Sequence, residues 1–157
     1  MKIRIENLRD YPQYIDTVVG WIYSEWGNNN RRYWDSWIRS SLSEKEIPKT
    51  YIIFVDNNIA GTYSLWRCDL QSRQDLYPWF GGLYVSSEYR GKEIEGIKLG
   101  ERMQTHALKQ VRELGYDKVY LFTEKDPRYY VANGWKVLSL IPDENDEDVT
   151  LCEYSFD

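Results

Sequence analysis

Two short segments decide the fold of this chain: LYVSSEYRGK at residues 83–92 and DPRYYVANGW at residues 126–135. The first reads as the end of a strand, a short loop and the basic triplet RGK at 90–92, which we expect to open a helix. The second follows the strand-like run KVYLFT at 118–123 and reads as a short helix. A helix N-terminus exposes unpaired backbone N–H groups and the positive end of the helix dipole. The first segment therefore suits a pyrophosphate, although on its own it fits an ordinary basic turn before a surface helix equally well.

The rest of the chain alternates strand-like and helix-like patterns on either side of these segments. Runs of β-branched and aromatic residues, or of alternating apolar and polar residues, predict strands at 2–8, 50–56, 59–66, 79–86, 118–123, 135–141 and 149–156. Apolar residues at helical spacing predict helices at 10–26, 34–42, 92–114 and 126–133. Asp10 is expected to cap the first helix, Asn28–Asn30 to separate it from the second, and Gly115 to end the longest.

The order of these elements is β-α-α-β-β-β-α-β-α-β-β, and the length of the chain fits a single domain over residues 1–157. Its class is α/β in the mixed α+β sense, with a mixed central sheet of about seven strands flanked by about four helices. The β-α-β unit from 79 to 123 is expected to have parallel strands and a right-handed crossover, the hand found in nearly all such units.

Composition and charge exclude several classes of function. The chain has 157 residues and a formal net charge of −5, and no cluster of Lys and Arg dominates, so no nucleic-acid role is expected. No apolar run reaches the length of a membrane span, and the N-terminus lacks the apolar region of a signal peptide. Cys68 and Cys152 are far apart and His106 is the only histidine, so no metal site is expected. These features favour a cytoplasmic protein with free thiols.

Taken together, the two deciding segments resemble the GNAT N-acetyltransferase family. In that family a strand ending in L-x-V leads to R-G-x-G-x-G or R-G-x-G-x-A, and a later Tyr precedes a Gly-aromatic pair in the pattern F-Y-x-x-x-G-F. The corresponding residues here are LYV at 83–85, RGK at 90–92 and YYVANGW at 129–135. The remainder of the chain matches the family only by the order of its elements.

The resemblance implies the GNAT acyl-CoA N-acyltransferase fold and a transfer of acetyl from acetyl-CoA to a primary amine of a small molecule or protein, by direct attack. It implies that two splayed strands admit the pantetheine arm, and that Tyr130 is the general acid for the leaving thiolate. The residues implied in cofactor binding are Leu83, Tyr84, Val85, Arg90, Gly91, Lys92, Glu93, Ile94 and Glu95.

The family does not fix the general base, although an alkylamine must lose a proton before it attacks. Glu25 at the end of the first predicted helix is one candidate, and Asp69 and Asp75 in the loop before the strand at 79–86 are others. Trp26, Asp69 and Trp79 are candidates for the acceptor pocket, although aromatic residues more often belong to the core.

The chain departs from the family pattern at Glu93 and Glu95, which replace the later glycines of the phosphate loop. If both side chains point to solvent, backbone N–H groups still bind phosphate. If one carboxylate covers the helix N-terminus, it repels phosphate. The alternative function is therefore a catalytically weak or inactive ligand-binding or regulatory domain. An interaction module with exposed Trp and Tyr side chains is a third option, and the oligomeric state is open, with a homodimer among the options.

Overall fold

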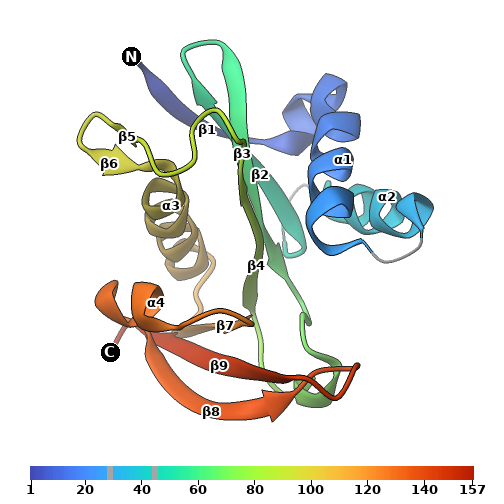
Figure 1. The fold of residues 1–157 in the computed structure, drawn as a ribbon, viewed down its shortest axis with the longest axis vertical. Helices are drawn as coiled ribbons and strands as arrows, with labels where there is room; N and C mark the ends of the chain where they lie inside the picture. Colours follow the sequence, from blue (N-terminus) through green and yellow to red (C-terminus); the bar gives the residue numbers. More distant parts are fainter. Residues whose placement is uncertain (28–29, 44–45) are drawn as a thin grey trace.

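The computed structural model describes residues 1–27, 30–43 and 46–157, and its centre is a seven-stranded sheet of strand order β1-β2-β3-β4-β7-β9-β8 (Figure 1). The strands are β1 (Ile3–Asn7), β2 (Lys49–Val55), β3 (Asn58–Trp66), β4 (Trp79–Val85), β7 (Lys118–Thr123), β8 (Lys136–Pro142) and β9 (Asp148–Ser155). A separate small hairpin consists of β5 (Glu93–Ile94) and β6 (Ile97–Lys98). The helices are α1 (Ile15–Trp26), α2 (Arg31–Ser40), α3 (Leu99–Glu113) and α4 (Arg128–Ala132). The predicted mixed sheet with its four helices is confirmed.

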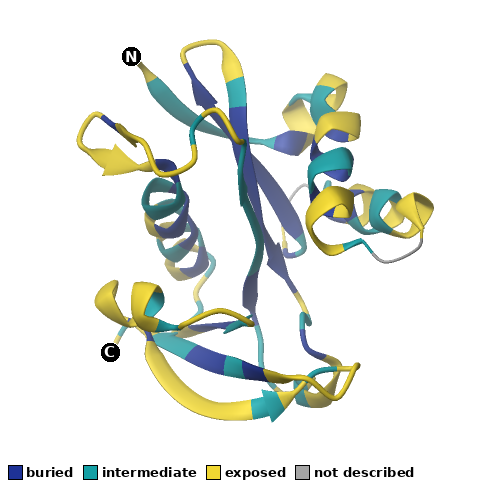
Figure 2. Ribbon diagram, viewed as in Figure 1, coloured by how far each residue is buried: buried dark blue, intermediate teal, exposed yellow. Residues whose placement is uncertain are grey.

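The helices cover both faces of the sheet, and each face has its own apolar core (Figure 1). On one face α3 packs through Leu99, Met103 and Ala107. On the other face α1 packs through Val18 and α2 through Ile38. Strands β2 and β3 are buried along nearly their whole length, whereas the edge strand β8 is mostly exposed (Figure 2). We call the two sides of the sheet the α3 face and the α1/α2 face.

The first helix begins later than its apolar spacing predicts. Separate 3₁₀ turns occupy Leu8–Asp10 and Pro12–Tyr14, and α1 begins only at Ile15. Asp10 therefore does not cap α1, and the cap of this region is Asn7, whose side chain accepts a hydrogen bond from Arg9 N at 3.0 Å. Residues 28 and 29 of the predicted break after this helix lie outside the described residues.

The longest helix also begins later than predicted, and this difference changes the candidate phosphate site. The prediction that RGK at 90–92 opens the helix is wrong, because the helix begins at Leu99. The six residues before it form the β5–β6 hairpin, in which Glu95 (φ 56°) and Gly96 (φ 80°) make the turn. Two consecutive residues with positive φ are characteristic of the tight turn that fits the twist of a hairpin, and Gly adopts this conformation without strain. Ile94 anchors the hairpin in the core of the α3 face.

Candidate active site

The site begins at a gap between two neighbouring strands. Strands β4 and β7 are parallel, yet the only residues in register are Trp79 and Tyr120 among those the structure describes. The strands then diverge (Figure 1), while β4 stays paired with β3 as far as Val85. Beyond Phe80, the backbone groups of β4 that face the gap have no partner on β7. Such an open strand edge is suited to pairing with an extended ligand.

A β-bulge in β4 lies beside this gap. Thr62 pairs with Tyr84 and Ser64 with Gly81, so β4 holds one more residue than β3 between these pairs. Gly82 adopts φ +61°, a left-handed conformation that a residue with a side chain rarely takes. A bulge bends its strand and re-aims the residues that follow. The bulge thus provides a physical reason for the divergence of β4 from β7.

Asp69 is the carboxylate that lies against this part of β4. A Cβ placed on Gly81 would lie 2.5 Å from Asp69 Oδ2 and 3.2 Å from the Trp66 ring, so only glycine leaves room for the carboxyl group. Among the described residues, no hydrogen-bond or ion-pair partner of Asp69 is found. The residue keeps some exposed surface, but desolvation of its carboxyl group raises its pKa to about 7. A general base works best with a pKa near the working pH.

The two other carboxylates considered as bases lie in different surroundings. Glu25 is exposed on the last turn of α1. Asp75 accepts two hydrogen bonds from Arg73, each at 3.0 Å, and this pairing lowers the pKa of Asp75. A base of low proton affinity takes up a proton poorly at neutral pH. Of the three candidates, Asp69 has the surroundings of a base.

The two tryptophans expected in the acceptor pocket differ in position. Trp79 is fully buried and donates its indole N–H to Leu76 O at 2.8 Å, so it belongs to the core of the α1/α2 face and the pocket prediction for it is wrong. Trp26 is 38% exposed at the end of α1. The sequence could not show that Trp79 is buried, because its burial depends on the pairing of β4 with β7 and on packing against residues distant in sequence.

Helix α4 carries the candidate acid on the α3 face. Tyr130 packs against the core of that face, with its ring edge-on to Trp135 at 6.2 Å. Burial, and to a smaller extent Cys152, raises the pKa of the Tyr130 hydroxyl, so it is protonated at neutral pH. The neighbouring Tyr129 is 37% exposed and reaches the first turn of α3, where its hydroxyl lies 3.3 Å from the position of a Cβ on Gly100.

The first turn of α3 has the features of an anion site. Its N-cap residue, Lys98, makes no capping hydrogen bond through its side chain. Arg102 Nε is buried without a hydrogen-bond partner, while the same guanidinium contacts Glu95 at 3.4 Å. A buried donor without a partner is costly, and an anion bound at this helix end would satisfy it. Sequence reasoning missed Arg102 and Gly100, although the spacing of Gly96 and Gly100 could have indicated that the helix starts between them.

The residues predicted to bind the cofactor surround the gap in two groups. Leu83 and Val85 pack on the α3 face. Tyr84 stacks on Trp21 of α1 with ring centroids 5.2 Å apart, and the Arg90 guanidinium lies 4.8 Å from the centroid of the same Tyr84 ring. Arg90 also donates from Nε to Val85 O at 2.7 Å, which holds it at the end of β4.

The loop after β4 accounts for the other predicted cofactor-binding residues. Gly91 (φ 72°) and Lys92 are exposed in the turn, and Glu93 is exposed on β5. Neither Glu93 nor Glu95 forms a hydrogen bond with the N–H groups of α3 in the described structure; Glu95 pairs with the Arg102 side chain instead.

In the described ranges no group of three or more His, Cys, Asp and Glu side chains could hold a metal ion. No described helix is both long enough and apolar enough to cross a membrane. Cys68 and Cys152 are free thiols.

Comparison with known proteins yields the same architecture. The model of the Acetyltransferase (GNAT) family matches residues 9–134. Among curated proteins, none matches this chain. An aminoglycoside 6'-N-acetyltransferase complexed with coenzyme A has a TM-score of 0.75 at 14% identity, over 99% of this chain and 97% of that one. The aminoglycoside 6'-N-acetyltransferase from Enterococcus faecium has a TM-score of 0.71 at 13% identity over the same shares. An acyl-CoA N-acyltransferase from Pseudomonas aeruginosa has a TM-score of 0.68 at 14% identity, over 98% and 99%.

At these identities the solved structures show the fold, whereas the family model identifies the relationship. It extends from the first 3₁₀ turn to Gly134 and so includes the gap, the bulge, α3 and α4. The resemblance inferred from the two deciding segments is thereby confirmed, and this chain belongs to the GNAT acetyltransferase family.

Proposed function

We propose that this protein is an N-acetyltransferase that moves the acetyl group of acetyl-CoA to a primary amine. The observation that carries the proposal is the divergence of β4 from β7 after the single Trp79–Tyr120 pair. That divergence leaves a strand edge without a partner next to a base on one face of the sheet and an acid on the other. A protein that only binds a ligand does not require a base and an acid on opposite faces of the sheet.

The described residues fit acetyl-CoA. The edge of β4 that β7 leaves unpaired after Phe80 would pair with the amide groups of the pantetheine arm, as far as Val85, whose carbonyl oxygen already accepts a hydrogen bond from Arg90. The first turn of α3, with Arg102, would hold the diphosphate, because the unpartnered Nε and the uncapped backbone N–H groups both favour an anion. When bound, acetyl-CoA supplies a thioester whose acetyl group an amine takes up directly.

The two proton transfers of the reaction are assigned to side chains on opposite faces of the sheet. On the α1/α2 face Asp69 accepts the proton that the acceptor ammonium must lose. On the α3 face Tyr130 donates its proton to the departing sulfur. Free N–H groups of β4 hold the carbonyl oxygen while its negative charge develops. The amine and the leaving group therefore meet different residues from opposite sides.

The structural neighbours favour a small amine as acceptor. Two of them are aminoglycoside 6'-N-acetyltransferases, whose substrates by name are amines of small molecules. We propose a small-molecule amine for this chain as well, and a cytoplasmic location, where free cysteines stay reduced.

One observation favours the alternative, a ligand-binding domain of weak or no activity. The β5–β6 hairpin occupies the part of the chain where the family has its glycine-rich phosphate loop. However, Glu93 points to solvent and Glu95 contacts Arg102. Neither glutamate covers the N–H groups of α3, so we expect the native loop to bind acetyl-CoA.

Isothermal titration calorimetry with acetyl-CoA tests this expectation. We expect the wild-type chain to bind with a dissociation constant below about 1 mM, the upper end of common KM values. The double variant Glu93→Gly, Glu95→Gly is expected to bind within about threefold of wild type, because Glu93 is exposed and the Glu95–Arg102 ion pair is partly exposed and so contributes little.

The two results that contradict this account differ in meaning. Absence of heat from the wild type at millimolar acetyl-CoA rejects the transferase function. A large gain in affinity in the double variant shows instead that the native glutamates impair the loop and favours the alternative function.

A further inference from the structure

A concave region lies on the α1/α2 face, where Trp66 forms part of its wall. Its volume is about 740 Å³, within the range of roughly 300–1,000 Å³ typical of small-molecule sites. It lies between α2, the end of β3 and the loop that follows β3. The described residues that line it are Tyr33, Ser36, Trp37, Ser40, Pro48, Trp66, Arg67, Cys68, Gln71 and Gln74. We call it the aromatic pocket.

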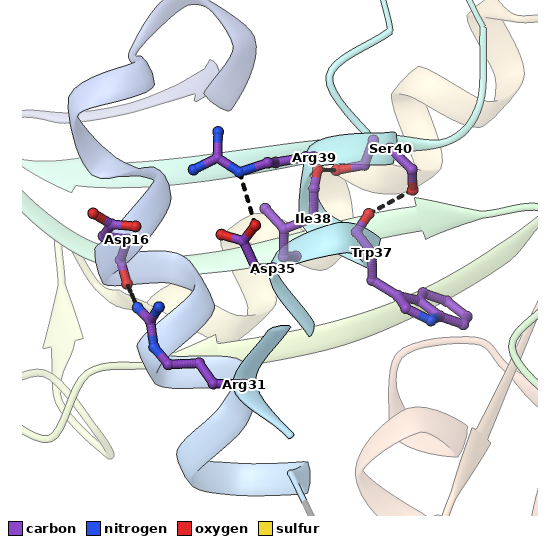
Figure 3. Close-up of polar contacts among 8 residues, drawn as sticks. Asp16, Arg31, Asp35, Trp37, Ile38, Arg39 and Ser40 are labelled. Atoms are coloured by element: carbon purple, nitrogen blue, oxygen red, sulfur yellow. Dashed lines mark hydrogen bonds and ion pairs between the residues drawn. The ribbon is translucent and has the colours of Figure 1, made fainter. Parts of the chain in front are cut away.

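The wall that α2 contributes is tied to α1 by one hydrogen bond, which Arg31 donates to Asp16 O at 3.1 Å (Figure 3). Within α2, Arg39 pairs with Asp35 one turn earlier at 2.9 Å. In the same view the Trp37 indole points away from the Asp35–Arg39 pair. Its ring meets Trp66 edge-on at 5.0 Å. The contact between the two indole rings forms without any ligand, which lowers the cost of ordering the pocket.

Trp66 connects the aromatic pocket to the reacting centre. The same ring that lines the pocket lies 3.2 Å from the position of a Cβ on Gly81, next to the Asp69 carboxyl group. Gly81 stands on β4 two residues after the last pair with β7. Trp66 therefore lies between the aromatic pocket, which it lines, and Asp69, which is not among the described lining residues.

The charges around the pocket are few. Arg67 is the single charged side chain among the described lining residues, and it has no ion-pair partner in the described parts of the chain. Arg67 precedes Asp69 by two residues, so a free cation and a free carboxyl group lie near each other in the chain. A ligand that carries an anion and an ammonium group complements both.

On the basis of the proposed transfer to an amine, we propose that the acceptor is an aromatic primary amine that carries a carboxylate. Its ring packs against Trp37 and Trp66, its carboxylate binds Arg67, and its ammonium group reaches Asp69. The reaction is the one already described. The ammonium loses one proton to Asp69, the neutral amine attacks the thioester carbonyl, and the C–S bond breaks as the sulfur takes a proton from Tyr130. The second proton of the nitrogen leaves to solvent, from which Tyr130 regains its own. This acceptor class differs from the polycationic amines, for which a pocket with a free arginine is unfavourable.

A pocket separate from the aromatic pocket is suited to a polycation. It is lined by Glu124, which follows β7, and by residues of the turn between β8 and β9. Four of its five described lining residues are acidic, namely Glu124, Asp143, Glu147 and Asp148. Asn145 N and Glu147 N both donate hydrogen bonds to the Asp143 carboxylate, so this acidic side chain also has a structural role in ordering the turn. A strong preference for polycations is thus the rival outcome of the test.

The test compares matched acceptors. Thiol release from acetyl-CoA is measured with L-phenylalanine, with phenethylamine, which lacks the carboxylate, and with spermidine as a polycation. We expect kcat/KM for L-phenylalanine to exceed that for phenethylamine by about tenfold, the effect of one charge-assisted hydrogen-bonded pair. Arg67→Gln is expected to abolish this difference and Arg67→Lys to keep part of it. Arg73→Gln, which alters an arginine of the same loop outside the pocket, is expected to change nothing.

Calorimetry with the same three compounds in the presence of coenzyme A separates this inference from the proposed function. If L-phenylalanine binds in an Arg67-dependent way but no amine is acetylated, the acceptor class stands and the transferase function fails. If amines are acetylated without dependence on Arg67, or if spermidine is preferred, the acceptor class is wrong and the transferase function stands. If L-phenylalanine neither binds nor reacts, the acceptor class is likewise rejected.

Discussion

Asp69→Asn is expected to lower kcat/KM by about 10²-fold or more, within the range that a general acid or base contributes. The asparagine preserves the shape of the side chain against Gly81 but cannot take up a proton. Because burial raises the pKa of Asp69 to about 7, the wild-type value of kcat/KM is expected to rise with pH and to level off above about 7. This rise reflects the growing fraction of the deprotonated carboxylate, and it should be absent from the variant. Thiol release from acetyl-CoA at several pH values measures both effects.

The controls for this variant are the two other carboxylates, Glu25→Gln and Asp75→Asn, which are expected to keep nearly full activity because both side chains are exposed. Stability provides a check on folding. The folded-state pKa of Asp69 lies above its unfolded value of 3.8, so the folded state loses stability as the pH rises from about 4 to about 7. Asp69→Asn removes this loss and should raise the melting temperature at pH 8. An unchanged pH profile in Asp69→Asn contradicts the assignment of the base.

Tyr130→Phe is expected to lower kcat by about 10²-fold while acetyl-CoA binds with nearly unchanged affinity. The hydroxyl forms no hydrogen bond in the described structure that its removal would break, and the ring keeps its contact with Trp135. A loss of kcat without a loss of binding is the pattern of an interaction that forms only in the transition state. Steady-state kinetics and calorimetry on the same preparation measure the two quantities.

The adjacent tyrosine is the matched control for this variant. Tyr129 lies beside Gly100 at the first turn of α3, where we place the diphosphate, and burial with the nearby Glu101 raises its pKa to about 12. Tyr129→Phe is therefore expected to weaken acetyl-CoA binding severalfold and to leave kcat nearly unchanged. The reverse pattern, with kcat lost in Tyr129→Phe and kept in Tyr130→Phe, shows that Tyr129 is the acid.

The strands and most of the helices could be predicted because their patterns are local. Periodic apolar residues in 99–111 of α3 and alternating or β-branched runs in β2 and β3 indicate both the type and the buried side of each element. The start of α3 could not be predicted in this way. The apolar residues in 93–98 have a spacing that suits both a helix and a hairpin. The hairpin forms because residues distant in sequence bury Ile94.

The candidate base illustrates the same limit for the site. Asp69 and Asp75 lie in one polar loop and look alike in the sequence. They differ because Asp69 packs against Gly81 of β4, whereas Asp75 pairs with Arg73 beside it. Contacts between residues distant in sequence set the proton affinity of one carboxylate, and no local pattern reports them. Tyr130, in contrast, lies in a motif whose spacing is local.

The central claim is that the gap between β4 and β7 seats the thioester-bearing ligand, and amide hydrogen exchange of β4 tests it most directly. In the free protein the gap-facing amides of Gly82–Val85 should exchange readily, because no strand pairs with them there. Saturation with acetyl-CoA should slow their exchange, together with that of the first amides of α3. Full protection of Gly82–Val85 without ligand, or no change on saturation with acetyl-CoA, would contradict the claim.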